Sequence, residues 1–279
     1  MQQLEHQGRF EFLKDNSLKS LEWEQIQSWI SIRTRSPLGA RLALAHLPFS
    51  TLQKATRLQL RIDEGIKLNS TSSIHGLLSD TVDVRECLER ATRESVLRPE
   101  EIFYCGHYYR TVATVGQELK LKATIAPLLA GDFSTCPKLP QICQTIAKSV
   151  TSDGRILDTA SRRLAQLRAS KAQKRSELEQ SLERHIRAWT EQGYLQDRFY
   201  DVIDGRYVVP VRAEMQNKLG GILMGRSQSG QSVYMEPPAL TVENNNLKQT
   251  DLEIRSEEYA ILVALSMEIG KLAEEFLPW

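Results

Sequence analysis

The chain has little of what marks a secreted, membrane-bound or disulfide-stabilised protein. It contains only four cysteines in 279 residues. Cys87, Cys105, Cys136 and Cys143 match no zinc-finger spacing and are too few for a disulfide scaffold. No signal-peptide pattern occurs, and no apolar run approaches the ~18 residues that a membrane span needs. These absences predict a cytoplasmic protein with reduced thiols and no membrane partner.

The sequence also lacks a recognisable catalytic centre. Its five histidines are scattered, and no Ser/His/Asp, Cys/His or paired-carboxylate grouping follows from the spacing. Cys105 and His107 have no second pair of metal ligands after them, so a buried cysteine beside a half-exposed histidine is the better interpretation. Gly221–Ser227 is one residue short of a phosphate loop and has Arg226 where lysine is required. We therefore predict no catalysis, no metal and no cofactor for these residues.

Charges of opposite sign nearly balance, 36 basic against 35 acidic residues, but they are segregated along the chain. Between Gly154 and Arg187 there are nine Arg or Lys and four Asp or Glu, whereas the segment from Glu243 to Glu275 is acidic by comparison. Two interpretations remain open: the two segments pair as helices through complementary charges, or the basic segment binds nucleic acid.

Arg198–Leu247 is the stretch that reads as β-sheet. Apolar residues alternate between Arg206 and Arg212, and Asp204-Gly205 is the residue pair that favours a type I′ hairpin. Two further strand-like segments, Gly221–Arg226 and Gln231–Glu236, are separated by Ser229-Gly230. Pro210 has no N–H to donate, which predicts an edge strand or a bulge. We expect a small antiparallel sheet of about four strands that needs support from other elements.

Long helices are predicted on both sides of this sheet. Gly154–Trp189 has no Pro or Gly in its interior, and its leucines recur at helical spacing. After the sheet the same spacing is seen in Leu262, Leu265, Ile269, Leu272 and Phe276. We expect an antiparallel two-helix lever arm with the sheet at its tip, and about 36 helical residues would extend roughly 54 Å.

The first 150 residues predict a helical body. A stripe of Leu18, Leu21, Ile26, Trp29 and Ile30 predicts an amphipathic helix that ends near Pro37. Further helices are expected over Pro37–Ala45, from Leu52 to Ile66 with Ser50 as N-cap, from Val82 to Ala91, from Pro99 to Val112 and over Leu139–Val150, with a break at Ala126–Pro140. The predicted fold is mainly α, divided into a loose N-terminus (1–16), a helical core (17–150), an outgoing lever helix (151–197), a β clamp (198–240) and a return helix (241–279).

Cations and amides gather on the hairpins and turns of the predicted sheet. They are Arg206, Arg212, Gln216, Asn217, Lys218, Arg226, Gln228 and Ser229. Such side chains can donate to phosphate oxygens, which positions a nucleic acid without reading its sequence. A solvated rim of a small sheet has the same composition, but a sheet held far from the body favours contact with a partner. We therefore predict a nucleic-acid interface at the tip.

Six motifs carry a family resemblance. Asp204-Gly-Arg-Tyr-Val-Val-Pro-Val-Arg212, Ser227-Gln-Ser-Gly-Gln-Ser-Val-Tyr-Met-Glu-Pro237 and Asn244-Asn-Asn-Leu247 resemble the clamp of the bacterial MutS homologues of the second branch, which lack the mismatch-reading domain. Ser20-Leu-Glu-Trp-Glu-Gln-Ile26, Ser36-Pro-Leu-Gly39 and Val96-Leu-Arg-Pro-Glu-Glu101 resemble the start of the same family's core domain. Arg212 stands where the family often has Lys, and no Phe-x-Glu wedge occurs, so direct mismatch recognition is not expected.

The resemblance implies a MutS-like core, a two-helix lever and a β clamp that embraces nucleic acid. It also implies homodimeric ATPases, with ATP and Mg bound outside these residues, that bind branched DNA and restrain homologous recombination. Some members act on collided ribosomes. In the family an ATPase, and usually an Smr endonuclease domain, follow the second lever helix. Since the helical pattern still runs at Leu277-Pro278-Trp279, we expect an N-terminal piece of such a protein.

Three functions follow from these observations. The first is non-sequence-specific binding of branched or structured DNA by the clamp. The second is binding of the clamp to a ribosome or its RNA. The third is a helical scaffold that mediates protein pairing.

Overall fold

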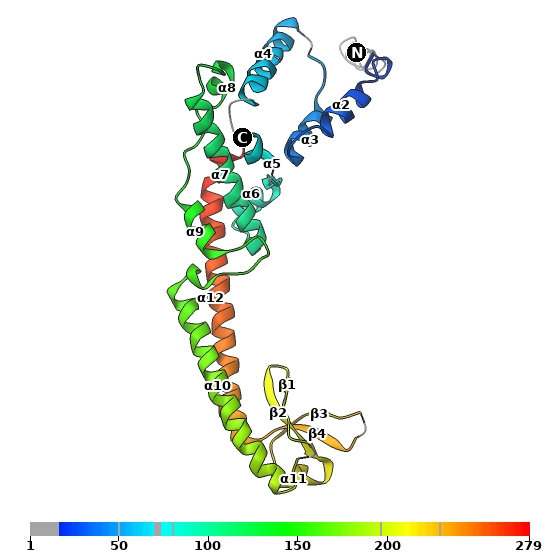
Figure 1. Cartoon of the computed structure of the whole chain (residues 1–279), viewed down its shortest axis with the longest axis vertical. Helices are drawn as coiled ribbons and strands as arrows, with labels where there is room; N and C mark the ends of the chain where they lie inside the picture. The colour runs from blue at the N-terminus through cyan, green and yellow to red at the C-terminus, as the bar shows by residue number, and fades with distance from the viewer. Residues whose placement is uncertain (1–16, 50, 70–73, 80, 196, 229) are drawn as a thin grey trace, which may run out of the picture. The chain divides into compact units, whose positions relative to one another are not determined.

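The computed structural model describes residues 17–279 except 50, 70–73, 80, 196 and 229. It is mainly helical, with one four-stranded antiparallel sheet (Figure 1). The described residues form two compact units, one made of the chain up to Arg155 together with Leu262–Trp279, the other of Ile156–Ile261. The mainly α fold with a small sheet is therefore confirmed, whereas the five-part domain division stays a prediction.

The first unit is built mainly of helices. Its helices are α2 (Trp23–Ser31), α3 (Pro37–Ala45), α4 (Leu52–Asn69), α5 (Ile74–Ser79), α6 (Arg85–Thr92), α7 (Pro99–Leu121), α8 (Pro127–Asp132), α9 (Ile142–Ser149) and the C-terminal part of α12 (Pro238–Phe276). Proline at the first position of α3 and α7 begins both helices as predicted, because its fixed φ suits the first turn. The expected N-cap Ser50 lies outside the described residues.

The N-terminal stripe was predicted wrongly. The chain turns at Glu22, which has a left-handed φ of 50°, so α2 begins only at Trp23. Trp29 and Ile30 are 53% and 47% exposed, while Gln27 is buried and donates to the carbonyl oxygens of Leu44 and His46. Helices α2 and α3 are thus joined by polar contacts. The break expected over Ala126–Pro140 likewise contains the short helix α8.

The second unit consists of α10 (Arg162–Glu191), the sheet, and the part of α12 up to Ile261. Its first helix starts later than predicted, because residues 158–160 form a 3-10 turn and the Ser161 hydroxyl accepts from Leu164 N–H as the N-cap. Helix α10 extends about 45 Å at 1.5 Å per residue. In Figure 1 the green α10 lies beside the orange part of α12.

The sheet contains β1 (Asp201–Ile203), β2 (Arg206–Arg212), β3 (Ile222–Arg226) and β4 (Ser232–Glu236) in the order β1-β2-β4-β3, all antiparallel. Asp204 and Gly205 both have positive φ, 51° and 75°, so the predicted hairpin turn joins β1 to β2. The short helix α11 (Gln216–Leu219) lies between β2 and β3.

Pro210 does not mark an edge strand, since β2 lies between β1 and β4. Strand β1 pairs only with Arg206–Val208 and has ended before Pro210. Arg212 N–H donates to Tyr194 O, and N–H groups two residues apart along a strand point to the same side. The N–H that proline lacks would therefore point to the side where β1 has ended, which is why an inner strand accepts this residue.

Among the described residues, no helix combines the length and the apolar character that crossing a bilayer requires.

Candidate nucleic-acid interface

One face of the sheet is anchored on the paired helices. Apolar residues from four elements form a single buried cluster: Leu178, Leu182, Ile186 and Trp189 of α10, Tyr207, Val209 and Val211 of β2, Val233 and Met235 of β4, and Leu240 and Leu247 of α12, with Leu195. The alternation of β2 and β4 places these residues on the same face, as the period of a strand requires. The support that the small sheet needs therefore comes from α10 and α12.

A buried polar network fixes the end of the sheet to α12. Glu236 has 0% exposure, and both its carboxylate oxygens accept from Arg206 Nη1 at 2.6 and 2.7 Å. Asn244, also fully buried, accepts from Tyr207 N–H at 2.9 Å and donates to Tyr207 O at 3.0 Å and to Glu236 Oε1 at 3.2 Å. Arg206 Nη2 further donates to Asn245 Oδ1 at 2.8 Å. The side-chain amide of Asn244 thus pairs with the backbone as a neighbouring strand would.

The Arg206 side chain therefore makes its contacts within the protein. Its side chain is 19% exposed, and its guanidinium is occupied by Glu236 and Asn245. Removing it to contact a phosphate would leave the Glu236 carboxylate buried without its cation, which costs several kcal/mol. A nucleic-acid contact by Arg206 therefore stays a prediction, and it would require this buried pair to open.

Arg212 and Arg226 lie at the opposite end of the sheet, on the two strands that flank β4. Arg212 of β2 pairs with Ser232, and Arg226 of β3 pairs with the next residue, Val233. Two strand spacings separate the arginine backbones, about 10 Å. Both side chains are exposed; Arg212 Nε donates to Leu195 O at 3.3 Å, and Arg226 has no ion pair among the described residues. The sheet therefore holds two outward cations on one end.

The turn after β3 adds polar groups beside Arg226. Gly230 N–H donates to Ser227 O, Ser227 N–H donates to Ser232 O, and Ser227 Oγ accepts from Ser232 N–H. These bonds give the turn a defined shape with Gln228 exposed at its tip. Ser229, also predicted as a contact, lies outside the described residues.

Helix α11 carries the third cation. Met215 and Leu219, four residues apart, pack against the buried cluster. Asn217 and Lys218 are exposed, whereas Gln216 is half-buried. Lys218 has no ion pair among the described residues. Of the eight predicted contacts, the structure therefore leaves Arg212, Asn217, Lys218, Arg226 and Gln228 exposed on the sheet and its turns.

The segment that resembles a phosphate loop does not fit a nucleotide. Ile222–Arg226 is strand β3 of a hairpin and is not followed by a helix, so no helix N-terminus can hold a phosphate there. Gly221 has a φ of 110°, and a Cβ at this position would lie 2.2 Å from Glu236 O. The glycine is thus required for close packing of the strand ends. ATP has no cradle in this segment.

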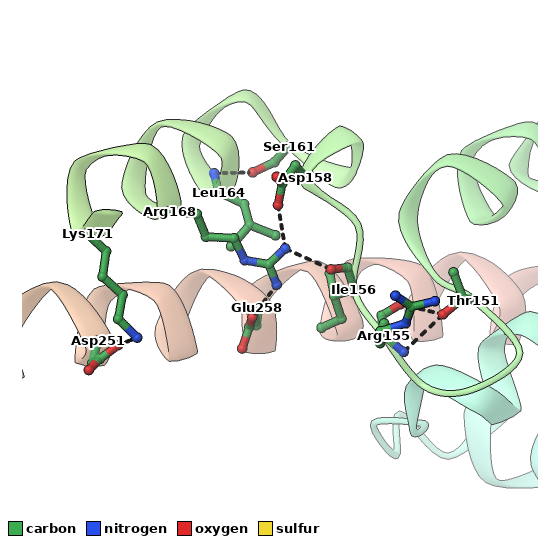
Figure 2. Close-up of polar contacts among 10 residues, drawn as sticks. All are labelled: Thr151, Arg155, Ile156, Asp158, Ser161, Leu164, Arg168, Lys171, Asp251 and Glu258. Atoms are coloured by element: carbon green, nitrogen blue, oxygen red, sulfur yellow. Dashed lines mark hydrogen bonds and ion pairs between the residues drawn. The ribbon is translucent and has the colours of Figure 1, made fainter. Parts of the chain in front are cut away.

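The cations of α10 that face α12 are largely paired inside the unit (Figure 2). Arg168 Nη2 lies 2.7 Å from Glu258 Oε1, and its Nη1 contacts Asp158 and Ile156 O. Lys171 pairs with Asp251. We call these contacts, together with Arg163–Glu257, Ser161–Glu257 and Lys174–Thr250, the charged seam.

The charged seam shows that the segregated charges serve helix pairing, one of the two interpretations that the sequence left open. Basic residues of α10 face acidic residues of α12 in antiparallel order, so complementary charge pairs the two helices at this level. Arg184 and Arg187, nearer the sheet, are exposed and have no ion pair among the described residues. They, and the exposed Arg198 beside the exposed Phe199, are further cations that the prediction of site residues omitted. The excess of basic residues in α10 was the signal for the first two.

These side chains suit binding more than bond-making chemistry. Exposed Arg, Lys and amide groups donate hydrogen bonds and attract anions. No group of three His, Cys, Asp or Glu side chains suited to a metal ion occurs within the part of the chain that the structure describes. Cys105 is buried and His107 half-buried, as the sequence predicted.

No family model matches the chain. The protein named endonuclease MutS2 of Pelotomaculum thermopropionicum is 29% identical over 257 residues, which cover 92% of this chain and 33% of that protein. The endonuclease MutS2 of Latilactobacillus sakei is 30% identical over 267 residues, covering 90% and 32%. That of Geobacillus sp. (strain WCH70) is 27% identical over 269 residues, covering 93% and 33%.

The chain spans about a third of the length of the curated relatives it matches. Over about 90% of its own length, it is homologous to one region of the endonuclease MutS2 proteins.

Proposed function

We propose that the sheet and its turns form a clamp that binds branched or structured DNA through the phosphate backbone, without sequence preference. The clamp would serve a MutS-like ATPase that restrains homologous recombination and works as a homodimer. We assign no catalytic step to the residues described here; nucleotide hydrolysis and nuclease activity would reside in other parts of such a protein.

The observation that carries the proposal is the contrast between two groups of cations. Arg163, Arg168 and Lys171 of the lever are paired with carboxylates. Lys218 and Arg226 on the sheet side are exposed and have no such partner among the described residues. Unpaired cations on a rigid scaffold attract a polyanion, because releasing condensed counterions from DNA supplies the free energy.

The similarity of the chain to proteins named endonuclease MutS2 supports a nucleic acid as the target and does not specify which one. Backbone contacts by Arg and Lys fix the position of a duplex and carry no base information. A preference for branches would arise if the exposed cations of the clamp meet phosphates of more than one helical arm.

The test is the triple replacement Arg212→Glu, Lys218→Glu and Arg226→Glu. Binding to a labelled four-way junction, a plain duplex and a structured RNA is measured across a salt series. Three phosphate contacts predict a slope of log affinity against log salt of about −2.7, or about a 40-fold loss between 50 and 200 mM salt. The triple variant should lose most of the affinity and most of the slope.

A matched control reverses three exposed cations of the first unit, Arg93, Lys120 and Lys138, with the same change in net charge. Its affinity for the junction should fall far less than that of the clamp variant. Equal losses would show that net charge alone attracts the DNA, and unchanged binding by the clamp variant would refute the proposal.

The RNA arm separates the DNA target from the ribosomal one. Junction affinity that ribosomes abolish at equal concentration, together with stronger binding of the structured RNA, would replace the DNA target by ribosomal RNA. A stable dimer with no salt-dependent binding of any nucleic acid would favour the protein scaffold instead.

A further inference from the structure

Two cysteines from neighbouring helices of the first unit lie in contact. Cys87 is on α6 and half-buried, while Cys105 is on α7 and fully buried. Arg90 of α6 pairs with Glu101 of α7 at 2.6 Å, and Cys87 and Cys105 each lie about one helical turn from that pair, so that the two thiols interact and each affects the titration of the other. This arrangement places one accessible sulfur directly against a protected one.

A cation stands beside the accessible sulfur. Arg90, one turn further along α6, has its Nη2 3.7 Å from Cys87 Sγ and 2.6 Å from Glu101 Oε1. Glu101 is in the first turn of α7, so the guanidinium is held between the two helices. A positive charge fixed near a half-buried sulfur favours the thiolate, which is the nucleophilic form of cysteine.

The titration of the pair agrees with this geometry. The hydrogen bond from Cys105 lowers the pKa of Cys87 to about 6; burial opposes the shift, the hydrogen bond from Arg90 adds to it, and the charge of Glu101 opposes it. The same hydrogen bond, together with burial, raises the pKa of Cys105. Both shifts favour the thiolate at Cys87 and the thiol at Cys105.

We propose that Cys87 and Cys105 form a redox-active pair that reacts with hydrogen peroxide and closes to a reversible disulfide. The Cys87 thiolate attacks the peroxide, an S–O bond forms, the O–O bond breaks, and the leaving hydroxide takes up a proton to become water. Cys105 then gives up its proton and attacks the Cys87 sulfur. The S–S bond forms, the S–O bond breaks, and the second oxygen leaves as water with that proton.

The electron balance closes without another reactant. Two thiols lose two electrons, and hydrogen peroxide gains them to become two waters. A thiol reductant reverses the reaction by opening the disulfide. The inference does not depend on nucleic-acid binding, since the pair lies in the first unit and the proposed clamp in the second.

The disulfide would connect α6 to α7, and α6 in turn packs closely against α12. The end of α6 approaches α12 closely: a Cβ at Gly270 would lie 2.4 Å from Ala91 O. A covalent tie from α6 to α7 would therefore restrict a packed corner of the first unit and slow amide exchange in α6. This effect is measurable in the full chain.

The test treats the full chain with a small excess of hydrogen peroxide and maps its peptides by mass spectrometry without reduction. The expected product is a Cys87–Cys105 disulfide that dithiothreitol removes. Cys136 and Cys143 are matched internal controls, because both thiols are buried. The Cys136 thiol donates a hydrogen bond to Val112 O, and the Cys143 thiol donates one to Gly106 O. Oxidation of all four cysteines at similar rates, or of none faster than free cysteine, would overturn the proposal.

Two variants separate the roles of the cysteines. Cys105→Ser keeps a hydroxyl donor to Cys87 but cannot form the disulfide, so peroxide should leave a sulfenic acid at Cys87 that dimedone traps. Cys105→Ala removes the donor, so the midpoint pH of Cys87 alkylation by iodoacetamide should rise from about 6 toward the ordinary cysteine value. An unchanged midpoint in Cys105→Ala, or a trapped sulfenic acid at Cys105 in place of Cys87 in the native chain, would refute the assignment.

Discussion

Replacing Asn244 by alanine should destabilise the sheet much more than replacing Asn246 by alanine. The two asparagines are two residues apart on α12, but Asn244 is fully buried and Asn246 is exposed. Extending the β2–β4 register places Pro237 opposite Tyr207. Because proline cannot donate to a strand, the amide of Asn244 supplies both the donor and the acceptor that Tyr207 needs at this point.

The magnitude follows from the groups that lose their partners. Asn244→Ala leaves the N–H and the C=O of Tyr207 unpaired in a residue that is 4% exposed, and removes one donor from Glu236. Each buried group left unpaired costs about 1–3 kcal/mol. Water entering the vacated space recovers part of this, so we expect about 2–4 kcal/mol. The gain in helix propensity from Asn to Ala is the same at position 246 and cancels in the comparison.

Hydrogen exchange of β2 peptides measures this loss locally, which matters because the chain has two units and need not unfold in one step. Peptides covering Arg206–Arg212 should exchange faster in Asn244→Ala by a factor that corresponds to the predicted free energy. The Asn246→Ala control should stay within about 0.5 kcal/mol of the native chain. Equal exchange in the two variants would show that the buried amide does not hold the sheet.

Two further predictions concern strain and acid stability. Gly221→Ala should destabilise the sheet by about 2 kcal/mol or more, because Gly221 has a positive φ and its added Cβ would lie 2.2 Å from Glu236 O. Gly225→Ala should be tolerated, because its Cβ would meet nothing closer than 3.7 Å. Urea denaturation of both variants checks this prediction, and equal midpoints would contradict it. Burial would raise the pKa of Glu101, but hydrogen bonds from the Arg98 backbone and from the Arg98 and Arg90 side chains outweigh it and lower the pKa below 4.5. A lowered folded-state pKa contributes stability above the unfolded value and loses it as the pH falls, so Glu101→Gln should cost about 1 kcal/mol at pH 7 and less at pH 3. A difference between native and variant chains that grows on acidification would refute this sign.

Local signals in the sequence were sufficient where the structure depends on neighbours in the chain. Asp204-Gly205 specifies its hairpin because both residues accept positive φ, and Pro37 and Pro99 begin helices because their own φ suits a first turn. The segregated charges of the two helical segments that flank the sheet left two interpretations open, and the structure shows one of them, the charged seam between α10 and α12. Such features need no knowledge of what lies far along the chain.

Other features depend on partners far along the chain, and only the tertiary structure decided them. Arg206 is a residue type that can contact a phosphate, yet its guanidinium pairs with the buried Glu236, 30 residues later in the chain. An outward and an inward arginine are identical in sequence, because burial depends on which surfaces meet and not on the residue itself. The sequence by itself thus determined a helical protein with a hairpin-built sheet that carries several cations, whereas the fold decided which of these cations are paired inside the protein, which are exposed, and which two cysteines meet.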